Sequence, residues 1–321
     1  MTPVVEVANL KKHFALSSGF LGRNPAIVKA VDGVSFAIGP GETLCLVGES
    51  GCGKSTVGKL LLRLLEPTEG AIRLDGEDIT HLSIGDMRPH RKRMQMVFQD
   101  PYASLNPRMA AGRIVSEPLE NYSDISSSER DTRVAELFEK VGLRTDAMKR
   151  YPFEFSGGQR QRLGIARALA LNPAVIIADE PVSALDVSVQ AQVLNLMMDL
   201  QEELGLAYLF VSHDLGVVEH IGHRVAVMYL GRIVEIADKE ALFEMPLHPY
   251  TKALMAAAPI PDPHVKRERI VLQGDVPSPI NPPPGCTFHT RCPFAFERCK
   301  VETPPLKPAA DGRQVACHLV D

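Results

Sequence analysis

The sequence predicts an α/β fold built around a parallel sheet. Short apolar segments with the character of strands alternate with segments of helical periodicity, an order typical of parallel sheets with crossover helices. Thr43–Val47 is a short apolar run typical of a strand, and Ala174–Ala178 is a continuous apolar run of the kind expected at the centre of a parallel sheet. A glycine-rich loop follows the first run and opens a helical segment at Ser55–Leu65.

The other expected elements fit this plan. Apolar and polar residues alternate near Val5 and Val7 and again at Val34–Ile38, which predicts half-buried edge strands. Val225–Leu230 and Ile233–Ile236 flank a glycine and predict a hairpin. Further strands are expected at Ala71–Leu74, Met94–Phe98 and Tyr208–Val211, and further helices at Glu129–Val141, Gln159–Leu171 and Asp186–Leu204.

The composition divides the chain into a main part and a tail. Residues 1–245 carry the α/β pattern, interrupted at about residues 102–165 by what we expect to be an inserted helical subdomain. Residues 246–321 form a C-terminal extension, with twelve prolines in the fifty residues from Pro259 to Pro308. Because proline interrupts helices and central strands, this extension is expected to be a linker or a small irregular module.

The bulk numbers exclude several classes of protein. The 321 residues, 45% of them hydrophobic, can bury a large core, and the net charge of −4 gives no reason to expect a nucleic-acid partner. The basic run Arg88–Arg93 is interpreted as a solvated face. No apolar run has the length of a membrane span, and the N-terminus lacks a signal-peptide pattern, so we expect a cytosolic protein whose membrane role, if any, comes through a partner.

A phosphate-binding loop occupies Gly48–Ser55. Its letters, GESGCGKS, fit G-x-x-x-x-G-K-[ST] between an expected strand and an expected helix, which is the context such a loop requires. Backbone N–H groups should cradle the phosphates, with Lys54 on the β- and γ-phosphates and the Ser55 hydroxyl on Mg²⁺. The residues expected to contact nucleotide here are Gly48, Glu49, Ser50, Gly51, Cys52, Gly53, Lys54, Ser55 and Thr56.

Polar residues follow three of the expected strands. Asp179 fits the carboxylate that holds Mg²⁺, and Glu180 is then placed to polarise a water for attack on the γ-phosphate. Gln99 and His213 follow two other strands, where the carboxyl ends of parallel strands place ligand-binding residues. Taken alone, either would pass for an ordinary turn residue.

A second anion-binding device lies at Ser156–Gln159. These residues, SGGQ, stand directly ahead of a helical run. A helix N-terminus carries unpaired N–H groups and a partial positive charge, and glycines let a ligand approach the backbone closely. One chain thus carries two phosphate-binding devices.

Together these motifs resemble the ATP-binding subunit of an ABC transporter, over residues 4–245 and in the family's order. The resemblance implies a P-loop NTPase fold with a RecA-like parallel-sheet core, an antiparallel β edge and an inserted helical subdomain. It implies ATP hydrolysis in which Glu180 activates water and Lys54, Gln99 and His213 act at the γ-phosphate, with Mg²⁺ held by Ser55, Gln99 and Asp179. The remaining matches are an adenine-stacking ring at Phe14, Walker B at Val175–Asp179 and a D-loop at Ser183–Asp186.

The resemblance also implies partners. In this family two cassettes enclose two ATP molecules head to tail, so Ser156, Gly157, Gly158 and Gln159 would contact the ATP of a second ABC ATPase subunit. Gly158→Asp is then expected to spare ATP binding at the chain's own loop and to prevent closure. Two transmembrane permease subunits, an extracytoplasmic substrate-binding protein acting through them, and a peripheral position on the cytoplasmic face of the inner membrane are also implied. A soluble ABC ATPase acting on DNA or ribosomes is the rival, disfavoured by the single cassette and the acidic balance.

Two segments resemble one subfamily more narrowly. Leu247–Leu254, LHPYTKAL, and Val97–Pro107, VFQDPYASLNP, look like the dipeptide and oligopeptide importers, in particular their F-type ATPase subunit. This resemblance implies that the cargo is a peptide and that the chain pairs with a D-type paralogue, with a homodimer as the alternative. Importers of nickel, glutathione or sugars use similar cassettes. The region around Gln99 is where the family docks the coupling helix of its permease.

Four of the six cysteines lie in the last 36 residues: Cys286, Cys292, Cys299 and Cys317. Clustered thiols in a cytosolic protein suggest a metal rather than disulfides. The short C-x₂₋₄-C spacing usual for structural zinc is missing, whereas four cysteine ligands suit a 4Fe-4S cluster, which some members of the subfamily carry. A 4Fe-4S cluster is therefore expected, with zinc or reduced thiols as alternatives. His289 and His318 could substitute as ligands, but they are interpreted as surface residues.

Overall fold

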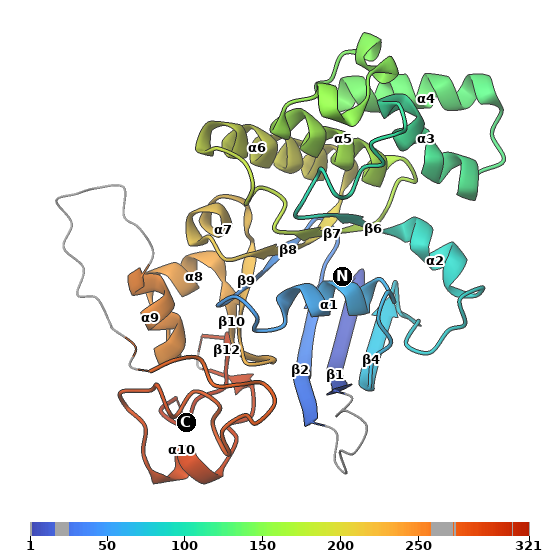
Figure 1. Ribbon diagram of the computed structural model, residues 1–321. Helices are drawn as coiled ribbons and strands as arrows, with labels where there is room; N and C mark the ends of the chain where they lie inside the picture. The colour runs from blue at the N-terminus through green and yellow to red at the C-terminus, as the bar shows by residue number, and fades with distance from the viewer. Residues whose placement is uncertain (1, 17–25, 258–271, 273, 310, 321) are drawn as a thin grey trace. The chain divides into compact units, whose positions relative to one another are not determined.

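The computed structural model describes residues 2–16, 26–257, 272, 274–309 and 311–320 (Figure 1). These residues form two compact units. The first contains residues 2–4, Ile38–Glu42 and Leu82–Val211, and the second contains Val5–Ala37, Thr43–His81 and the described residues after Val211. In the described residues, no helix has the length and hydropathy that crossing a bilayer requires.

The first unit is built on three parallel strands. β6 (Met94–Val97) pairs with β7 (Val175–Asp179), and β7 pairs with β8 (Ala207–Ser212), with Met94 opposite Val175 and Val175 opposite Ala207. All five residues of β7 are buried, as expected of a strand covered on both faces. The prediction of a parallel sheet is confirmed for this unit.

Helices pack together over residues 111–169 of the same unit. α3 (Ala111–Tyr122), α4 (Ser127–Lys140) and α5 (Gly157–Leu169) contact one another, as Figure 1 shows, and α5 also contacts α6 (Val187–Leu204). The remaining helical elements of the unit are α2 (Met87–Arg93), η1 (Thr145–Lys149) and η2 (Pro152–Glu154).

The ends of α4 show why its sequence forms a helix there. The Ser126 hydroxyl accepts the backbone N–H of Glu129, and the Glu129 carboxylate accepts the N–H of Ser126. This reciprocal pair satisfies two groups that a helix start leaves open, so the helix begins two residues before the predicted Glu129. Val134, Leu137 and Phe138 are buried on the predicted face.

An antiparallel sheet forms part of the second unit, with the strand order β2-β1-β4-β5. β1 (Val5–Leu16) runs antiparallel to β4 (Glu69–Leu74), with Val5 opposite Leu74. The other two strands are β2 (Ala26–Ile38) and β5 (Glu77–Asp78). The half-buried edge strands predicted from alternation are therefore present, and both extend further than the alternation indicated.

The second sheet of this unit has the order β11-β12-β10-β9-β3. β3 (Thr43–Val47) is parallel to β9 (Arg224–Tyr229), which forms the predicted hairpin with β10 (Arg232–Asp238). The C-terminal extension joins the sheet, since β12 (Gln314–Val315) pairs with β10 and β11 (Lys307–Pro308) pairs with β12. The described part of the extension is thus attached to this sheet through β12, and that part is not a free linker.

The helices of the second unit are short. α1 (Lys54–Leu61) ends four residues before the predicted Leu65, because Arg63 takes the left-handed conformation, with φ of 51°, and breaks the helical path. The others are α7 (Leu215–Ile221), α8 (Lys239–Glu244), α9 (Pro249–Ala257) and α10 (Glu297–Val301). After α9 the described chain is mostly irregular, as its proline content predicts (Figure 1).

Candidate active site

The phosphate loop has the backbone of an anion-binding site. Gly48, Gly51 and Gly53 have φ values of 153°, 79° and 108°, in the region that favours glycine. Gly53 is the N-cap of α1 and makes no side-chain capping bond. The first N–H groups of α1 therefore open into the loop, where an anion can bind them.

Two of these glycines are also required by close packing. A Cβ on Gly48 would lie 2.1 Å from the backbone oxygen of Met228, and a Cβ on Gly53 would lie 2.1 Å from that of Ala30. Gly51 has open space around it. Gly48 and Gly53 thus allow the loop to pack closely against neighbouring backbone, whereas Gly51 is needed only for its backbone conformation in the turn.

Lys54 is buried and reaches back into the loop. Its ammonium donates to the backbone oxygens of Gly48 at 2.8 Å and Glu49 at 3.0 Å. A cation is thus held at the centre of the loop, where phosphates would meet it. The Cys52 sulfur is 3.8 Å from the ammonium, and burial raises the pKa of that thiol, so Cys52 stays a neutral packing residue.

The predicted acids lie at the end of β7 in the other unit. Asp179 is the buried last residue of the strand, and Glu180 follows it with φ of 46°, which is strained for a residue with a side chain. The Glu180 N–H donates to the Val211 oxygen at 3.0 Å, which fixes the strained residue to β8. The Gln99 amide donates to the Glu180 carboxylate at 2.9 Å. The structure therefore brings two of the predicted catalytic residues into contact.

The D-loop between Glu180 and α6 is held by its own side chains. Ser183 donates from its hydroxyl to the Glu180 oxygen at 3.1 Å, and Asp186 caps α6 by accepting the Val189 N–H at 3.0 Å. The Gln190 amide donates to the backbone oxygens of Val182 and Leu185. The loop that follows the proposed catalytic acid thus has a defined conformation.

Ser156 is the N-cap of α5. Its hydroxyl accepts the Gln159 N–H at 3.3 Å, and its own N–H donates to the Gln159 side-chain oxygen at 3.0 Å. Both residues are exposed, as is Gly157, so the start of α5 can meet a ligand from outside the unit.

Gly158 differs from its neighbours because it is buried. A Cβ here would lie 2.3 Å from Cγ1 of Val189 on α6. Gly158→Asp would therefore disturb the packing of α5 on α6 as well as any ligand, which corrects the expectation that its effect would be confined to closure. Gly157, whose Cβ would lie 3.3 Å from the end of the Leu185 side chain, is the better position for that experiment.

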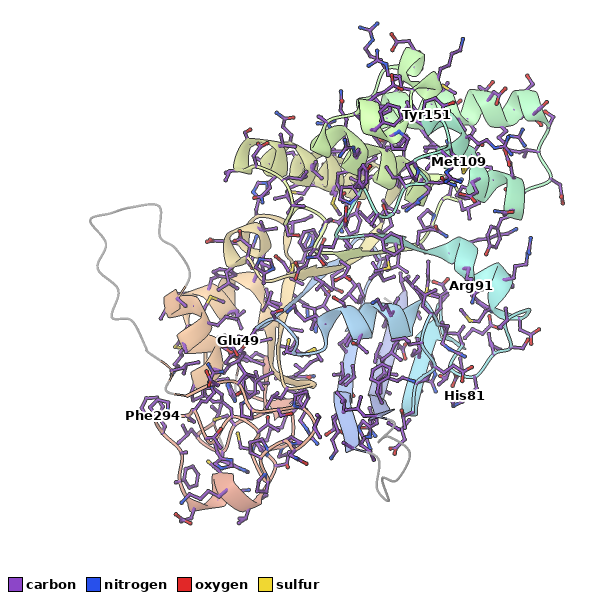
Figure 2. The ribbon with its side chains drawn as sticks, in the orientation of Figure 1. Glu49, His81, Arg91, Met109, Tyr151 and Phe294 are labelled. Carbon is purple, nitrogen blue, oxygen red and sulfur yellow. The ribbon has the colours of Figure 1, made fainter. Side chains whose placement is uncertain are left out.

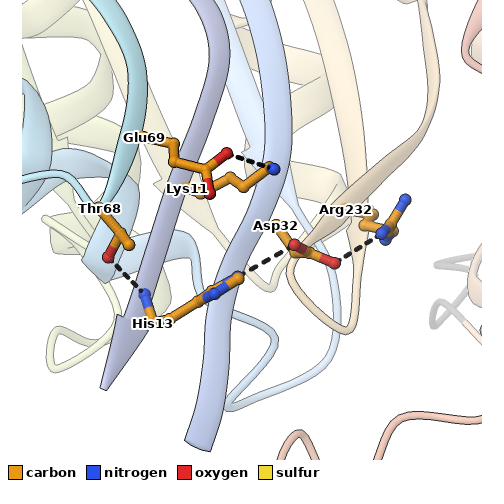
Figure 3. A network of polar contacts seen from close by, with 6 residues as sticks. All are labelled: Lys11, His13, Asp32, Thr68, Glu69 and Arg232. Atoms are coloured by element: carbon orange, nitrogen blue, oxygen red, sulfur yellow. Dashed lines mark hydrogen bonds and ion pairs between the residues drawn. The ribbon is translucent and has the colours of Figure 1, made fainter. Parts of the chain in front are cut away.

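The aromatic ring predicted for adenine lies near the end of β1. Phe14 is half-buried, and the Lys12 ammonium lies 5.0 Å from the centre of its ring. The adjacent His13 contacts Asp32 of β2 at 3.0 Å, and Asp32 also accepts from Arg232 of β10 at 2.6 Å (Figure 3). The His13 backbone N–H donates to the Thr68 hydroxyl. This polar network fixes the strand end that carries Phe14.

The predicted active-site residues are divided between the two units. Phe14, the Gly48–Thr56 loop and His213 belong to the unit of β3, whereas Gln99, Asp179, Glu180 and the Ser156–Gln159 segment belong to the unit of β7. His213 is exposed and directly follows β8.

Two contacts to the phosphate loop were not predicted. The Glu49 N–H donates to the Tyr250 hydroxyl at 2.9 Å, and the Glu49 carboxylate accepts from Arg291. Tyr250 lies in the LHPYTKAL segment, which resembles the peptide importers, but that pattern does not indicate that Tyr250 contacts Glu49.

The four C-terminal thiols are gathered by the fold. The four thiols lie close enough for the charges of their thiolate forms to interact in every pair. Cys286 interacts with the other three, Cys292 with Cys299 and Cys317, and Cys317 with Cys299. Burial raises the pKa of Cys286 to about 11, and it also raises the pKa of Cys292 and Cys317. Over the described ranges, no group of three or more His, Cys, Asp or Glu residues is placed so that it could hold a metal ion.

Two segments of the chain match known protein families. Residues 31–183 match the family described as ABC transporter. Residues 234–299 match the family described as oligopeptide/dipeptide transporter, C-terminal region.

Curated relatives match over nearly the full length. The "Probable peptide ABC transporter ATP-binding protein y4tS" of Sinorhizobium fredii is 60% identical over 98% of this chain and 90% of its own. The "Oligopeptide transport ATP-binding protein AppF" of Bacillus subtilis is 57% identical over 98% and 97%. The chain belongs to the ABC transporter ATP-binding proteins. The "Dipeptide transport ATP-binding protein DppF" of Haemophilus influenzae, 53% identical over 100% and 98%, is a further member.

Solved ABC cassettes share the fold of this ABC protein. The ATP-binding cassette MJ0796, solved as a dimer in a post-hydrolysis state with ADP and Pi, gives a TM-score of 0.65 at 31% identity, over 73% of this chain and 98% of that chain. The structure of cbiO1 from Clostridium perfringens, part of the transporter complex cbiONQ, gives 0.65 at 26% identity, over 76% and 92%. The predicted ABC cassette fold is confirmed.

Proposed function

We propose that this chain is the ATP-hydrolysing subunit that energises import of dipeptides or oligopeptides through a membrane permease. The observation that carries the proposal is the identity of 53–60% over nearly the whole chain to ATP-binding proteins of peptide transport. The match of residues 234–299 to the C-terminal region of oligopeptide/dipeptide transporters supports the same cargo.

The proposed roles of the active-site residues follow from their chemistry. Lys54 and the open N–H groups of α1 bind the β- and γ-phosphates. Ser55, Gln99 and Asp179 would hold Mg²⁺, which would supply charge neutralisation on the phosphates. Glu180 accepts the proton of the attacking water, with Gln99 and His213 positioned at the γ-phosphate. The contact of Gln99 with Glu180 supports a common role for these two residues.

The start of α5 is proposed to serve the nucleotide of a second ATPase subunit. Ser156, Gly157 and Gln159 are exposed and present a capped helix N-terminus, which suits an external phosphate. The dimeric form of the MJ0796 cassette supports this arrangement. The partner is a D-type paralogue, and a second copy of this chain is the alternative.

The permease is proposed to dock on four exposed aromatic residues of the first unit. Phe98 and Tyr102 flank Gln99, and Tyr151 and Phe153 stack on each other with ring centres 5.8 Å apart. Arg160 of α5 joins the two pairs, because its guanidinium lies 5.1 Å from the Tyr102 ring and donates to the backbone of Pro152. Figure 2 shows Tyr151 at the surface of this helical group.

This aromatic surface is connected to two proposed parts of the active site in the same unit, the start of α5 at Ser156 and the residue Gln99. Arg167 of α5 donates to the Ser104 oxygen at 2.6 Å and lies 5.8 Å from the Phe98 ring. α5 begins at the Ser156 cap, and Phe98 precedes Gln99. A movement of the Ser156 cap or of Gln99 would therefore be transmitted to a permease helix bound to this surface. The subunit would lie peripherally on the cytoplasmic face of the inner membrane, and an extracytoplasmic binding protein would deliver the peptide to the permease.

The C-terminal thiols are proposed to hold a 4Fe-4S cluster, with zinc as the alternative. Their mutual proximity supports this, and so do backbone N–H groups directed at three of the sulfurs. Cys286, Cys292 and Cys317 each accept from the residue two positions later. Such bonds stabilise thiolate ligands and tune cluster potentials. Among the described residues no group of three is placed so that it could hold a metal, so binding would require these residues to move closer together.

Reconstitution tests the proposed function. The chain would be co-expressed with its permease and paralogue, purified, and placed in vesicles with a saturating concentration of the binding protein. Peptide-stimulated ATP hydrolysis and peptide uptake are expected together, and both should disappear in Glu180→Gln. Uptake of nickel or glutathione instead of peptides would overturn the cargo assignment, while an assembly without ATPase activity would overturn the function.

A further inference from the structure

A carboxylate stands inside the phosphate loop. Glu49 is the second residue of Gly48–Ser55, next to backbone groups that attract anions. Its negative charge would repel nucleotide phosphates unless another group compensated it. The compensating group lies in the C-terminal extension, 242 residues away in the sequence.

Arg291 pairs with Glu49 at two points. Nη1 donates to Oε2 at 2.9 Å, and Nη2 donates to Oε1 at 3.2 Å. The side chains are 9% and 29% exposed, so water screens this pair less than it screens a surface pair. Two parallel bonds also fix the direction of the carboxylate.

Tyr250 holds the backbone of the same loop residue. Its hydroxyl accepts the Glu49 N–H at 2.9 Å, and its ring is fully buried on α9. The ring centre lies 4.7 Å from that of Tyr229 and 5.4 Å from that of Phe288. Glu49 is therefore held through both its backbone and its side chain by residues from outside the loop.

The thiol-bearing segment positions Arg291. The Arg291 N–H donates to the Phe288 oxygen at 3.0 Å, and the buried Phe288 ring lies 5.2 Å from Tyr229. Cys286, two residues before Phe288, donates from its N–H to the Cys299 oxygen at 2.8 Å. The guanidinium thus depends on the fold of the segment that carries the cysteines.

We propose that Arg291 is a positioning residue of the nucleotide site, which neutralises Glu49 and so sets the affinity of the phosphate loop, while Tyr250 fixes the loop backbone. The proposal rests on the proposed function and adds to it a role for the C-terminal extension. Loss of Arg291 leaves an uncompensated carboxylate beside the phosphates, and loss of both charges removes the repulsion.

Titration of MgADP by calorimetry tests this in the full chain. Arg291→Gln is expected to weaken binding about tenfold, because the remaining carboxylate opposes the phosphates. Glu49→Gln removes the repelling carboxylate and should bind more tightly than the unchanged protein, whereas the double variant should return to within about threefold of the unchanged protein. Arg298→Gln is the control, since Arg298 of α10 pairs with Glu302, the residue after that helix, and its loss should leave the affinity unchanged.

A merely structural role gives a different pattern. If Arg291 only stabilised the fold, the double variant would bind as weakly as Arg291→Gln, and that result would overturn the proposal, as would an unchanged affinity in Arg291→Gln. Arg291→Met keeps the apolar stem and serves if the glutamine variant does not fold. Failure of the unchanged protein to bind MgADP would instead count against the proposed function.

Discussion

The Gln99 side-chain amide donates a hydrogen bond of 2.9 Å to the carboxylate of Glu180. One residue follows β6 and the other follows β7, so the parallel pairing of these strands places both at the same edge of the sheet. Glu180 also has a left-handed backbone, with φ of 46°. A strained residue that is held on both its backbone and its side chain is characteristic of a position whose side chain must point in one direction.

Glu180→Gln should strongly reduce turnover and keep nucleotide binding. The substitution preserves size and can keep a hydrogen bond to Gln99, but an amide cannot accept the proton of water. Turnover should fall by about 10²–10⁴, the usual contribution of a general base. Steady-state ATPase assays and MgATP titrations measure the two properties separately. Normal turnover in this variant would show that Glu180 is not the base.

Gly158→Ala should destabilise the first unit by steric overlap with α6. The added Cβ would lie 2.3 Å from Cγ1 of Val189, and overpacking of this kind costs about 1–3 kcal/mol. Thermal unfolding should show the loss, and Val189→Ala in the same chain should recover most of it. Gly157→Ala is the matched control, because its Cβ meets only the flexible end of Leu185. Equal melting temperatures for the two glycine variants would contradict the packing argument.

Local patterns predicted the strands and the phosphate loop well. Thr43–Val47 is found as β3 with the predicted bounds, and Ala174–Ala178 differs from β7 by one residue at each end. Both strands are buried along their whole length and mostly apolar, and both are followed by residues with special backbone conformations. Signals of this kind lie within a few residues of each other and need no knowledge of the rest of the fold.

Contacts between distant segments could not be predicted in the same way. No local pattern indicates that Arg291 reaches Glu49, or that Val315 pairs with Glu235 and brings the tail onto the sheet. The burial of Gly158 was hidden for the same reason, since its neighbour Val189 belongs to another helix. The sequence therefore predicted which chemical groups form the site, whereas the structure was needed to show which distant residues position them.

Asp32 should make stability depend on acid pH. Burial acts to raise its pKa, but the charge of Arg232 and the hydrogen bonds from Arg232 and His13 outweigh burial and lower it (Figure 3). A carboxylate with a lowered pKa stabilises the fold above its unfolded pKa of ~3.9, and this contribution is lost as the pH falls through the lower folded value. Urea unfolding of Asp32→Asn should show reduced stability at pH 7 and a smaller loss between pH 5 and pH 3 than the unchanged chain.

The matched control for Asp32 is Asp146→Asn. Asp146 pairs with Arg144 on the surface, with half of its side chain exposed, so its removal should change stability by about 1 kcal/mol or less. If Asp32→Asn behaved like this surface variant at pH 7, the network at the end of β1 would not contribute to stability.

The four C-terminal thiols should bind a metal when the protein is purified without oxygen. A 4Fe-4S cluster predicts about four irons per chain, broad absorption near 400 nm, and loss of both in Cys286→Ser and Cys299→Ser. Cys45→Ser is the control, because Cys45 lies buried in β3, a strand that does not pair with the strands of the extension. The same serine variants should also weaken MgADP binding, since Arg291 depends on the segment that the cysteines would hold. One zinc per chain without iron would replace the cluster with a zinc site, whereas metal-free protein with normal nucleotide affinity would show that the thiols serve neither purpose.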